Sequence, residues 1–308
     1  MGEARIKAIG AAGQELSLRE ANLPAVSAEI LEDHRDHHFR RIPARRVTGE
    51  QTALRFINEA GFCAAFTAGL GLPCLREAIE GQREPPLPHH IQHDRAIMMT
   101  WNLKNVLPAR RAVYYGKALG GRPSFIALEL LPSFLRLRVA ADGYQRLYQR
   151  GMLSHCAKLV MDVLTRRGPS ETKALKLATG FAQPKMRSEF DRAMKELQEK
   201  FLALKVEERY DPFTYVWDTL EHRWAEATRR ARHLKPQHAA YHLVRRYYEV
   251  AGYGNERAVA RLLGLDPVLV EDATRRLEHE QVVCRGIRVV EYRQALTVLT
   301  KFLRSRPH

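Results

Sequence analysis

The chain has 308 residues, of which 45% are hydrophobic, 28% charged and only 8% aromatic. This composition is typical of a soluble globular protein, and the length predicts two or three domains because single hydrophobic cores rarely grow so large. No apolar run reaches the roughly 20 residues that a membrane-spanning helix needs. Residues 1–17 lack the apolar stretch and cleavage site of a secretory signal. We therefore expect neither a membrane span nor secretion.

Charge is the strongest compositional signal, with 50 Lys and Arg against 35 Asp and Glu and a net charge of +15. The basic and acidic residues number 14 and 13 in residues 1–110, 19 and 13 in 111–221, and 17 and 9 in 222–308. A basic surface attracts phosphate backbones through counterion release, without reading bases. The sequence therefore predicts a nucleic-acid partner in the last two thirds of the chain, with a merely soluble basic protein as the alternative.

Cysteine spacing and missing motifs exclude several classes of protein. The four cysteines stand far apart, with no CxxC pair. This excludes a zinc ribbon and a disulfide scaffold, and it predicts a cytoplasmic location where thiols stay reduced. The sequence also lacks a P-loop, a dinucleotide fingerprint, a GxSxG motif and a kinase signature, so we expect no cofactor.

One pair of histidines has metal-ligand spacing, because His34 and His38 are one turn apart on a predicted helix. No HExxH motif accompanies the pair, and Arg35, Arg40 and Arg41 would oppose a cation. We therefore expect no bound metal.

Residues 1–150 predict a mostly helical N-terminal domain, and one interpretation places a diverged winged helix in it. Apolar periodicity predicts helices over five stretches: Gly49 to Gly61, Pro73 to Gly81, Ile97 to Leu107, Pro108 to Leu119, and Ser124 to Leu137 with an interruption at Pro132.

Residues 151–221 predict a winged helix-turn-helix module. The stretch from His155 to Arg166 has one apolar helix face, and Ser170 is the predicted N-cap of a short second helix. Pro184 to Lys200 predicts a third helix, since proline is well tolerated at a first helical position. Phe201 to Val216 predicts a β-hairpin. Helix, short helix, helix and two-stranded wing follow one another in the winged-helix order.

Residues 222–293 repeat this order. The first apolar helix begins at Gln237, Asn255 caps the short helix, Pro267 opens the third, and Val282 to Val290 predicts the wing. Two matching units support the module interpretation better than one alone.

Residues 294–308 predict a C-terminal tail that contains an amphipathic helix. The predicted fold class is mainly α with small β wings (α+β), built from tandem winged helix-turn-helix modules. The predicted domains are 1–150, 151–221, 222–293 and 294–308.

The third helix of the middle module is the best candidate for DNA contact. Its apolar stripe includes Phe190 and Leu197, which leaves polar and basic residues on the outer side. Recognition helices present such residues to the groove or to phosphates. The candidates for DNA contact are Lys185, Arg187, Ser188, Arg192 and Lys195. The alternative is a solvated helix face, because three glutamates share that helix.

The last module offers a second, more acidic set of candidates. Arg275 and Arg276 lie on its third helix among several carboxylates. This favours a module that packs within the protein over one that contacts DNA. Arg285 and Arg288 of the wing are better placed for phosphates.

Several segments resemble one family of bacterial proteins. They include EAGFCAAF, LPCLREAI, MMTWNLKNVLPARRAVYYGKALGGRPSF and GPSETKALKLATG. The family has tandem winged helices, and its characterised members are alkylpurine DNA glycosylases that unhook interstrand crosslinks. The resemblance runs from about Val47 to Val290 and rests on module order and scattered motifs. It implies three winged-helix modules around double-stranded DNA, with base excision in the N-terminal one.

The sequence departs from that family at its catalytic motif. The family carries Gln-apolar-Gln or Gln-apolar-Asp, whose polar groups position a hydrolytic water, and the corresponding residues here are Ala64, Ala65 and Phe66. None of these side chains can hold a water or stabilise a sugar cation. The family's usual catalytic group is therefore absent at this position.

Two carboxylates remain as candidate catalytic residues. Glu59 lies beside the motif position among apolar residues, where burial would raise its pKa and suit it to general base work. The alternative is an ion pair at the helix end, for example with Arg55. Asp94 is the second candidate, because an excision site needs a carboxylate or a positioned water.

The sequence leaves two functions open. One is a double-stranded-DNA-binding protein of DNA repair, related to the glycosylases and with base excision undecided. The other is a catalytically inactive DNA-binding module or a transcriptional regulator. An RNA-binding protein is less favoured, because no RNA-recognition motif is present.

Overall fold

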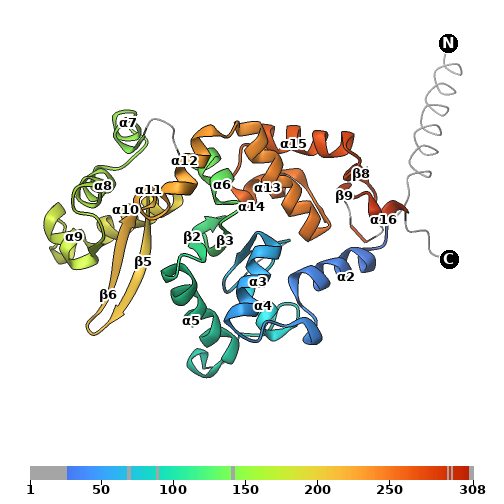
Figure 1. Cartoon of the computed structure of the whole chain (residues 1–308), viewed down its shortest axis with the longest axis horizontal. Helices are drawn as coiled ribbons and strands as arrows, with labels where there is room; N and C mark the ends of the chain where they lie inside the picture. Colours follow the sequence, from blue (N-terminus) through green and yellow to red (C-terminus); the bar gives the residue numbers. More distant parts are fainter. Residues whose placement is uncertain are drawn as a thin grey trace, which may run out of the picture.

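A computed structural model describes residues 26–67, 71–87, 90–139, 143–289, 291–292 and 294–304. The described chain is mainly helical, and its strands form three small antiparallel sheets of three strands each (Figure 1). The predicted fold class, mainly α with small β sheets, is therefore confirmed. Among the described residues, no helix is long and apolar enough to cross a bilayer.

Three units share one order of elements: helix, strand, helix, helix, strand, strand. The first unit (50–127) contains α3 (Glu50–Ala60), β1 (Phe62–Ala64), α4 (Leu75–Glu80), α5 (Arg95–Ala109), β2 (Val113–Leu119) and β3 (Arg122–Ala127). The second unit (155–219) contains α8 (His155–Arg167), β4 (Ser170–Glu171), α9 (Thr172–Thr179), α10 (Arg187–Glu199), β5 (Ala203–Tyr210) and β6 (Phe213–Thr219). The third unit (236–299) contains α13 (Pro236–Ala251), β7 (Tyr253–Gly254), α14 (Glu256–Leu263), α15 (Pro267–His279), β8 (Val283–Ile287) and β9 (Leu296–Leu299). In every sheet the last strand of the unit lies in the middle.

The remaining elements precede, connect or follow these units, except that η2 and η3 lie within the first and second units. They are α2 (Ala28–Phe39), η1 (Pro43–Arg45), η2 (Ile91–His93), α6 (Leu131–Arg138), α7 (Gly143–Gln149), η3 (Pro184–Met186), α11 (Leu220–Arg223), α12 (Ala225–His233) and α16 (Lys301–Arg304).

Local capping explains why several helices begin where the sequence predicts. The Asn255 side chain accepts hydrogen bonds from two backbone N–H groups at the start of α14, and Pro267 is the first residue of α15. In the second unit the prediction is off by a few residues. Ser170 lies in β4 rather than capping α9, and Pro184 opens the 3₁₀ turn η3 that leads into α10.

Two predicted helices of the first unit are wrong in whole or in part. The stretch from Pro108 to Leu119 contains strand β2, and the stretch from Ser124 to Leu137 contains most of β3 before α6 begins. A short apolar run in a buried strand cannot be told from a buried helix by periodicity alone. Gly120 and Gly121, both with positive φ, turn the chain between these two strands.

The predicted C-terminal helix is also wrong in part. Leu296–Leu299 forms β9, the central strand of the third sheet, and only the four residues of α16 are helical. β9 pairs with both β7 and β8. The strand that pairs with β8 is therefore β9, from further along the chain, and not the strand predicted at Ile287 to Val290.

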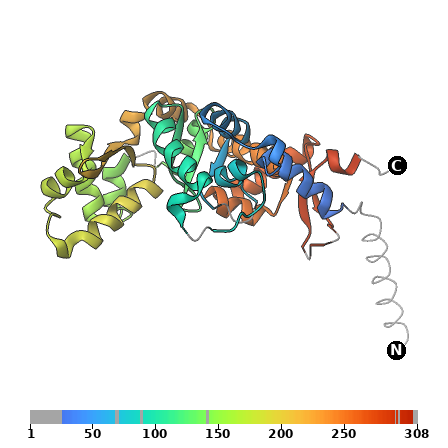
Figure 2. The ribbon, with the colours of Figure 1, turned by 90° about the horizontal axis from the view of Figure 1, so that it is seen from below.

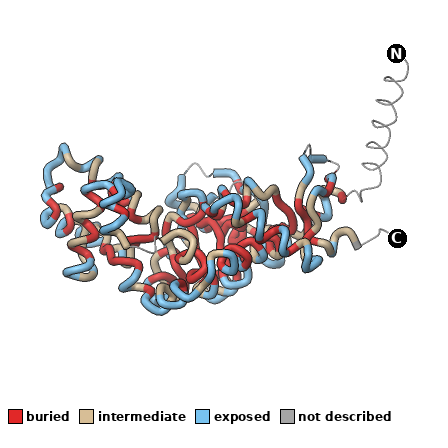
Figure 3. Tube along the Cα trace, turned by 90° about the horizontal axis from the view of Figure 1, so that it is seen from above, coloured by how far each residue is buried: buried red, intermediate tan, exposed pale blue. Residues whose placement is uncertain are grey.

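The buried side chains fall into two main cores. One core joins the first and third units, and it includes residues from α3, α13 and α15. The second unit has a separate core built on α8, α10 and Trp217. Figure 2 shows the second unit at one end of the molecule, and Figure 3 shows the buried trace concentrated in the middle. Phe201, which follows α10, and Leu204 of β5 belong to the first of these cores, and the Phe201 ring stacks on that of Tyr114, so the second unit shares apolar contacts with the other two.

Arg138, the last residue of α6, contacts all three units. Its guanidinium donates hydrogen bonds to the carbonyl oxygens of Ala118 in β2 (3.0 Å), Leu263 at the end of α14 (3.2 Å) and Glu199 at the end of α10 (3.0 Å). The guanidinium carbon also lies 5.0 Å from the centroid of the Phe201 ring. A cation at two helix C-termini is favoured, because the exposed carbonyl groups there carry partial negative charge. Arg138 thus ties β2, α10 and α14 together.

Gly264 is required for this arrangement. Its φ of +65° is a left-handed conformation that ends α14, and an added Cβ would lie 2.4 Å from Nη1 of Arg138. A side chain at this position would therefore strain the backbone and displace the guanidinium.

We expect R138M to lower the free energy of unfolding by about 3 kcal/mol, because it leaves three carbonyl groups without their donor. Lysine cannot reproduce the planar fork of donors, so R138K should recover only part of the loss. Urea unfolding followed by circular dichroism measures this, with the exposed α3 variant R55M as the control. R138M with the stability of the parent protein would contradict the role of Arg138.

Candidate nucleic-acid interface

The five candidates on the middle module lie together in the structure. Lys185 is in η3 and the other four are on α10, and all five side chains are exposed. The buried face of α10 is Phe190, Ala193, Met194 and Leu197. Ser188, Arg192 and Lys195 follow one another at helical spacing on the side opposite this face. The residues that sequence periodicity placed on the outer face are therefore exposed there.

The cations of α10 are only weakly engaged within the chain. Arg187 is 3.8 Å from Asp191 and Lys195 is 3.7 Å from Glu199, and all four side chains are exposed. Such exposed pairs contribute little energy. In the described part of the chain, neither Lys185 nor Arg192 has an ion-pair partner. These side chains can turn toward an external anion at little cost.

The candidates of the third unit lie in a different setting. Arg275 pairs with Glu271 (3.0 Å) and Asp272 (3.1 Å). Arg276 pairs with Glu280 (2.8 Å) and lies over the Tyr241 ring. The helices α15 and α10 are in units at opposite ends of the molecule (Figures 1 and 2). The two basic helices therefore do not form one continuous patch.

The wing candidates of the third unit differ from each other. Arg285 is half-buried and pairs with Glu256 (2.7 Å), whereas Arg288 is exposed. An anion would have to compete with intramolecular carboxylates for Arg275, Arg276 and Arg285. The third unit is thus a poorer surface for phosphate than α10.

The structure places Glu59 on the surface, which corrects the premise that it is buried. Its side chain is 56% exposed and its Oε2 lies 2.8 Å from Nη2 of Arg40. The buried face of α3 is formed by Ala53, Phe56, Ile57 and Ala60, so Glu59 faces outward. Glu59 therefore forms an ion pair, as the alternative interpretation expected, but its partner is Arg40 rather than Arg55.

Asp94 has a structural partner of its own. It is the N-cap of α5, and its Oδ1 accepts a hydrogen bond from the backbone N–H of Ile97 at 2.6 Å. The catalytic role of Asp94, like that of Glu59, stays a prediction.

The position of the family motif is apolar and closed. Ala64 and Ala65 are fully buried at the end of β1, and Phe66 packs on Trp101 with ring centroids 5.8 Å apart. Trp101 is 46% exposed on α5. No polar side chain stands at this position, in agreement with the sequence.

The structure brings together a charged cluster that sequence reasoning missed. Glu208 of β5 accepts a hydrogen bond from Nζ of Lys104 on α5 (2.5 Å) and forms an ion pair with Lys205. Asn105 and Tyr210 also donate to Oε2 of Glu208, each at 2.9 Å. No local signal could reveal this cluster, because its residues come from two units that are far apart in sequence. It connects the first unit to the wing of the second.

The cluster shifts two pKa values. Burial would raise the pKa of Glu208, but the hydrogen bonds from Lys104 and Lys205 outweigh it and lower the pKa to about 2. Burial also lowers the pKa of Lys205 to about 8, although Glu208 opposes this shift. Glu208 is therefore a carboxylate throughout the physiological pH range.

The structure places His34 and His38 side by side on α2. The His34 and His38 rings lie 4.2 Å apart, and burial together with the charge of His38 lowers the pKa of His34 to about 3. In the described residues, no group of three or more His, Cys, Asp or Glu side chains is placed to hold a metal ion.

We expect E208Q to cost about 3 kcal/mol of unfolding free energy at neutral pH, since it leaves two lysines without their carboxylate. The pKa of Glu208 is lower in the folded chain than its ordinary value of 4.5, so its contribution is present above that pH. The contribution is lost as the pH falls from about 4.5 to 2. Urea unfolding at several pH values measures this, with the exposed neighbour variant E207Q as the control. A loss in E208Q that stays constant with pH would contradict it.

Comparisons with known proteins fit this architecture. A family model described as AlkZ related matches residues 47–264. Among solved structures, the chain is similar to the Streptomyces sahachiroi DNA glycosylase AlkZ, with a TM-score of 0.56 and 13% sequence identity. That similarity covers 92% of this chain and 73% of the other, and at this identity it shows the fold. No curated protein matches the chain. Because the family model spans well over half of its length, the chain belongs to the AlkZ-related family.

Proposed function

We propose that the protein binds double-stranded DNA in a DNA-repair setting, with α10 as its main contact. The observation that carries the proposal is the exposed surface of η3 and α10, where Lys185 and Arg192 have no ion-pair partner among the residues that the structure describes. Phosphate contacts need only such side chains. Membership of the AlkZ-related family and the fold of a DNA glycosylase support the repair setting.

We further propose that each of the three units is a winged helix-turn-helix module. The support is their common element order and the central position of the last strand in each sheet. In such modules the third helix and the wing meet the duplex, and these elements are α10 and the β5–β6 hairpin in the second unit. The four cysteines have free thiols, which suits a cytoplasmic protein.

Base excision is the second candidate function, and the family membership favours it. The apolar motif position opposes it, because Ala64, Ala65 and Phe66 offer nothing to position a water. Asp94 caps a helix and Glu59 pairs with Arg40, so a catalytic role would require either carboxylate to change partners. We therefore give precedence to DNA binding.

We expect the triple variant K185E/R192E/K195E to weaken binding to a 20-base-pair duplex and to reduce the salt dependence of binding. Each lost phosphate contact should lower the slope of log affinity against log salt by about 1. Fluorescence anisotropy at several salt concentrations measures both quantities.

The control for this variant is K235E/R257E/R261E, which makes the same charge change in or next to the third unit. All six replaced side chains are exposed, so both variants should fold. An equal loss in the two variants would mean that total charge, rather than α10, determines binding. An unchanged slope in the α10 variant would also contradict the proposal.

For a duplex that carries N7-methylguanine, we expect binding without base release above a protein-free control. Alkali-labile strand breaks measure release. Release that falls more than about tenfold, or 1.4 kcal/mol of barrier, in E59Q or D94N would overturn this and identify the catalytic carboxylate. D94N is suited to the test because Asn is also a good N-cap, so the variant separates capping from acid–base chemistry.

A further inference from the structure

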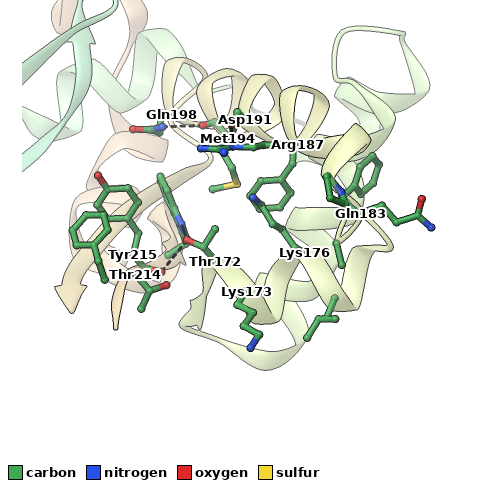
Figure 4. Close-up of a pocket in the computed structure, with 17 residues that line it drawn as sticks. Thr172, Lys173, Lys176, Gln183, Arg187, Asp191, Met194, Gln198, Thr214 and Tyr215 are labelled. Atoms are coloured by element: carbon green, nitrogen blue, oxygen red, sulfur yellow. Dashed lines mark hydrogen bonds and ion pairs between the residues drawn. The ribbon is translucent and has the colours of Figure 1, made fainter. Parts of the chain in front are cut away.

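A groove opens in the second unit, beside the proposed duplex-binding face of α10. It lies between α9, α10 and β6 and has a volume of about 760 Å³ (Figure 4). That volume is within the roughly 300–1,000 Å³ range of sites that hold small organic ligands. Arg187, Asp191 and Gln198 line the groove from α10. The groove and the outer stripe of Ser188, Arg192 and Lys195 therefore occupy neighbouring faces of one helix.

One wall of the groove is aromatic. Phe213, Tyr215 and Trp217 follow one another at alternate positions of β6, with successive ring centroids 5.1 and 5.8 Å apart. Phe213 is 58% exposed, so its ring contributes little to the core of this unit. Trp217 is held in place by a hydrogen bond from its Nε1 to Oγ1 of Thr172 (3.0 Å). The neighbouring rings meet edge to face, and the exposed ring of Phe213 is free to stack on a ligand.

The opposite walls are cationic. Lys173 and Lys176 line the groove from α9, and Arg187 lines it from α10 (Figure 4). Lys176 extends over the Phe190 ring, with Nζ 5.1 Å from the ring centroid. Asp191 is the one acidic side chain among the lining residues that the structure describes, and it lies 3.8 Å from Arg187. The groove therefore carries a net positive charge.

From this juxtaposition we infer that the groove binds unpaired nucleotides of a DNA strand. The bases stack on Phe213 and Tyr215, and Lys173 and Lys176 contact the phosphates. Aromatic faces beside cations are the combination that binds unstacked nucleotides without sequence preference. The inference deepens the proposed function: a duplex held on α10 would deliver an extruded nucleotide to the adjacent groove. Full-length protein should therefore prefer DNA that contains unpaired bases.

The test uses three fluorescein-labelled probes and anisotropy. They are a fully paired duplex, the same duplex with two unpaired thymines, and a ten-residue thymine single strand. The unmodified protein should bind the bulged duplex at least about fivefold more tightly than the paired one, as expected for stacking of one base. F213A should abolish this preference, with a smaller loss of binding to the paired duplex, because Phe213 also belongs to the β5–β6 wing. F213W should keep the preference, and F213L, which is apolar but not aromatic, should lose it.

Matched variants separate the groove from the rest of the unit. K173A/K176A should weaken binding to the bulged duplex and the single strand more than K235A/K117A, which removes the same charge elsewhere. Y148A removes a partly exposed aromatic ring of α7 outside the groove and should have no effect. Because Phe213 and Lys173 are exposed, their replacement should leave the thermal unfolding midpoint unchanged.

Three results would overturn the inference: equal affinity for bulged and paired duplexes, an equal loss on both in F213A, or full preference in F213L. The last result would indicate a groove for apolar side chains, as in a peptide site. The single strand separates this inference from the proposed function. Binding of the single strand that F213A abolishes, without binding of any duplex, would support the groove and refute duplex binding by α10.

Discussion

Three carbonyl oxygens from three different units converge on the guanidinium of Arg138, and the arrangement of the molecule depends on this contact. Two of the carbonyls end helices α10 and α14, where the peptide groups have no partner within the helix. Only a planar cation with several donors can satisfy all three at once. The end of α10 is thereby held against β2 and α14, and Gly264 leaves the space in which this occurs.

The second unit has a core of its own and is joined to the other two units by Phe201 and Leu204 and by a set of polar contacts. Arg138 holds one end of α10, and the cluster of Lys104, Lys205 and Glu208 holds the wing against α5. Such contacts depend on direction, so they determine orientation as well as proximity. They therefore decide where the outer face of α10 and the adjacent groove point.

The part of the chain with the largest excess of basic residues is not the part with the most unpaired cations among the candidate residues. Residues 222–308 have the largest excess of basic residues, yet three of the four candidate arginines there are paired with carboxylates of the same unit. The surface of η3 and α10 has fewer cations, but Lys185 and Arg192 lack such partners within the described chain. For an anionic ligand, the pairing of each cation matters more than the total charge, since a paired cation must first lose its partner.

The sequence by itself determined the features that depend on neighbours within a few residues. These include the helices of the second and third units, the cap at Asn255, the start of α15 at Pro267, and the exposed stripe of α10. Capping and helix amphipathicity are local, because their partners lie three or four positions away. The sequence also indicated correctly that the family's motif position, at Ala64, is apolar.

Features whose partners are distant in sequence depended on how the chain folds. Strands β2, β3 and β9 have apolar runs that suit a buried helix equally well, and their pairing alone made them strands. The ion pair of Glu59 depended on Arg40, and the environment of Glu208 on Lys104 from another unit. The groove beside α10 likewise required three elements to meet. Sequence spacing carries no information on such contacts, because the fold, and not the chain, brings these residues together.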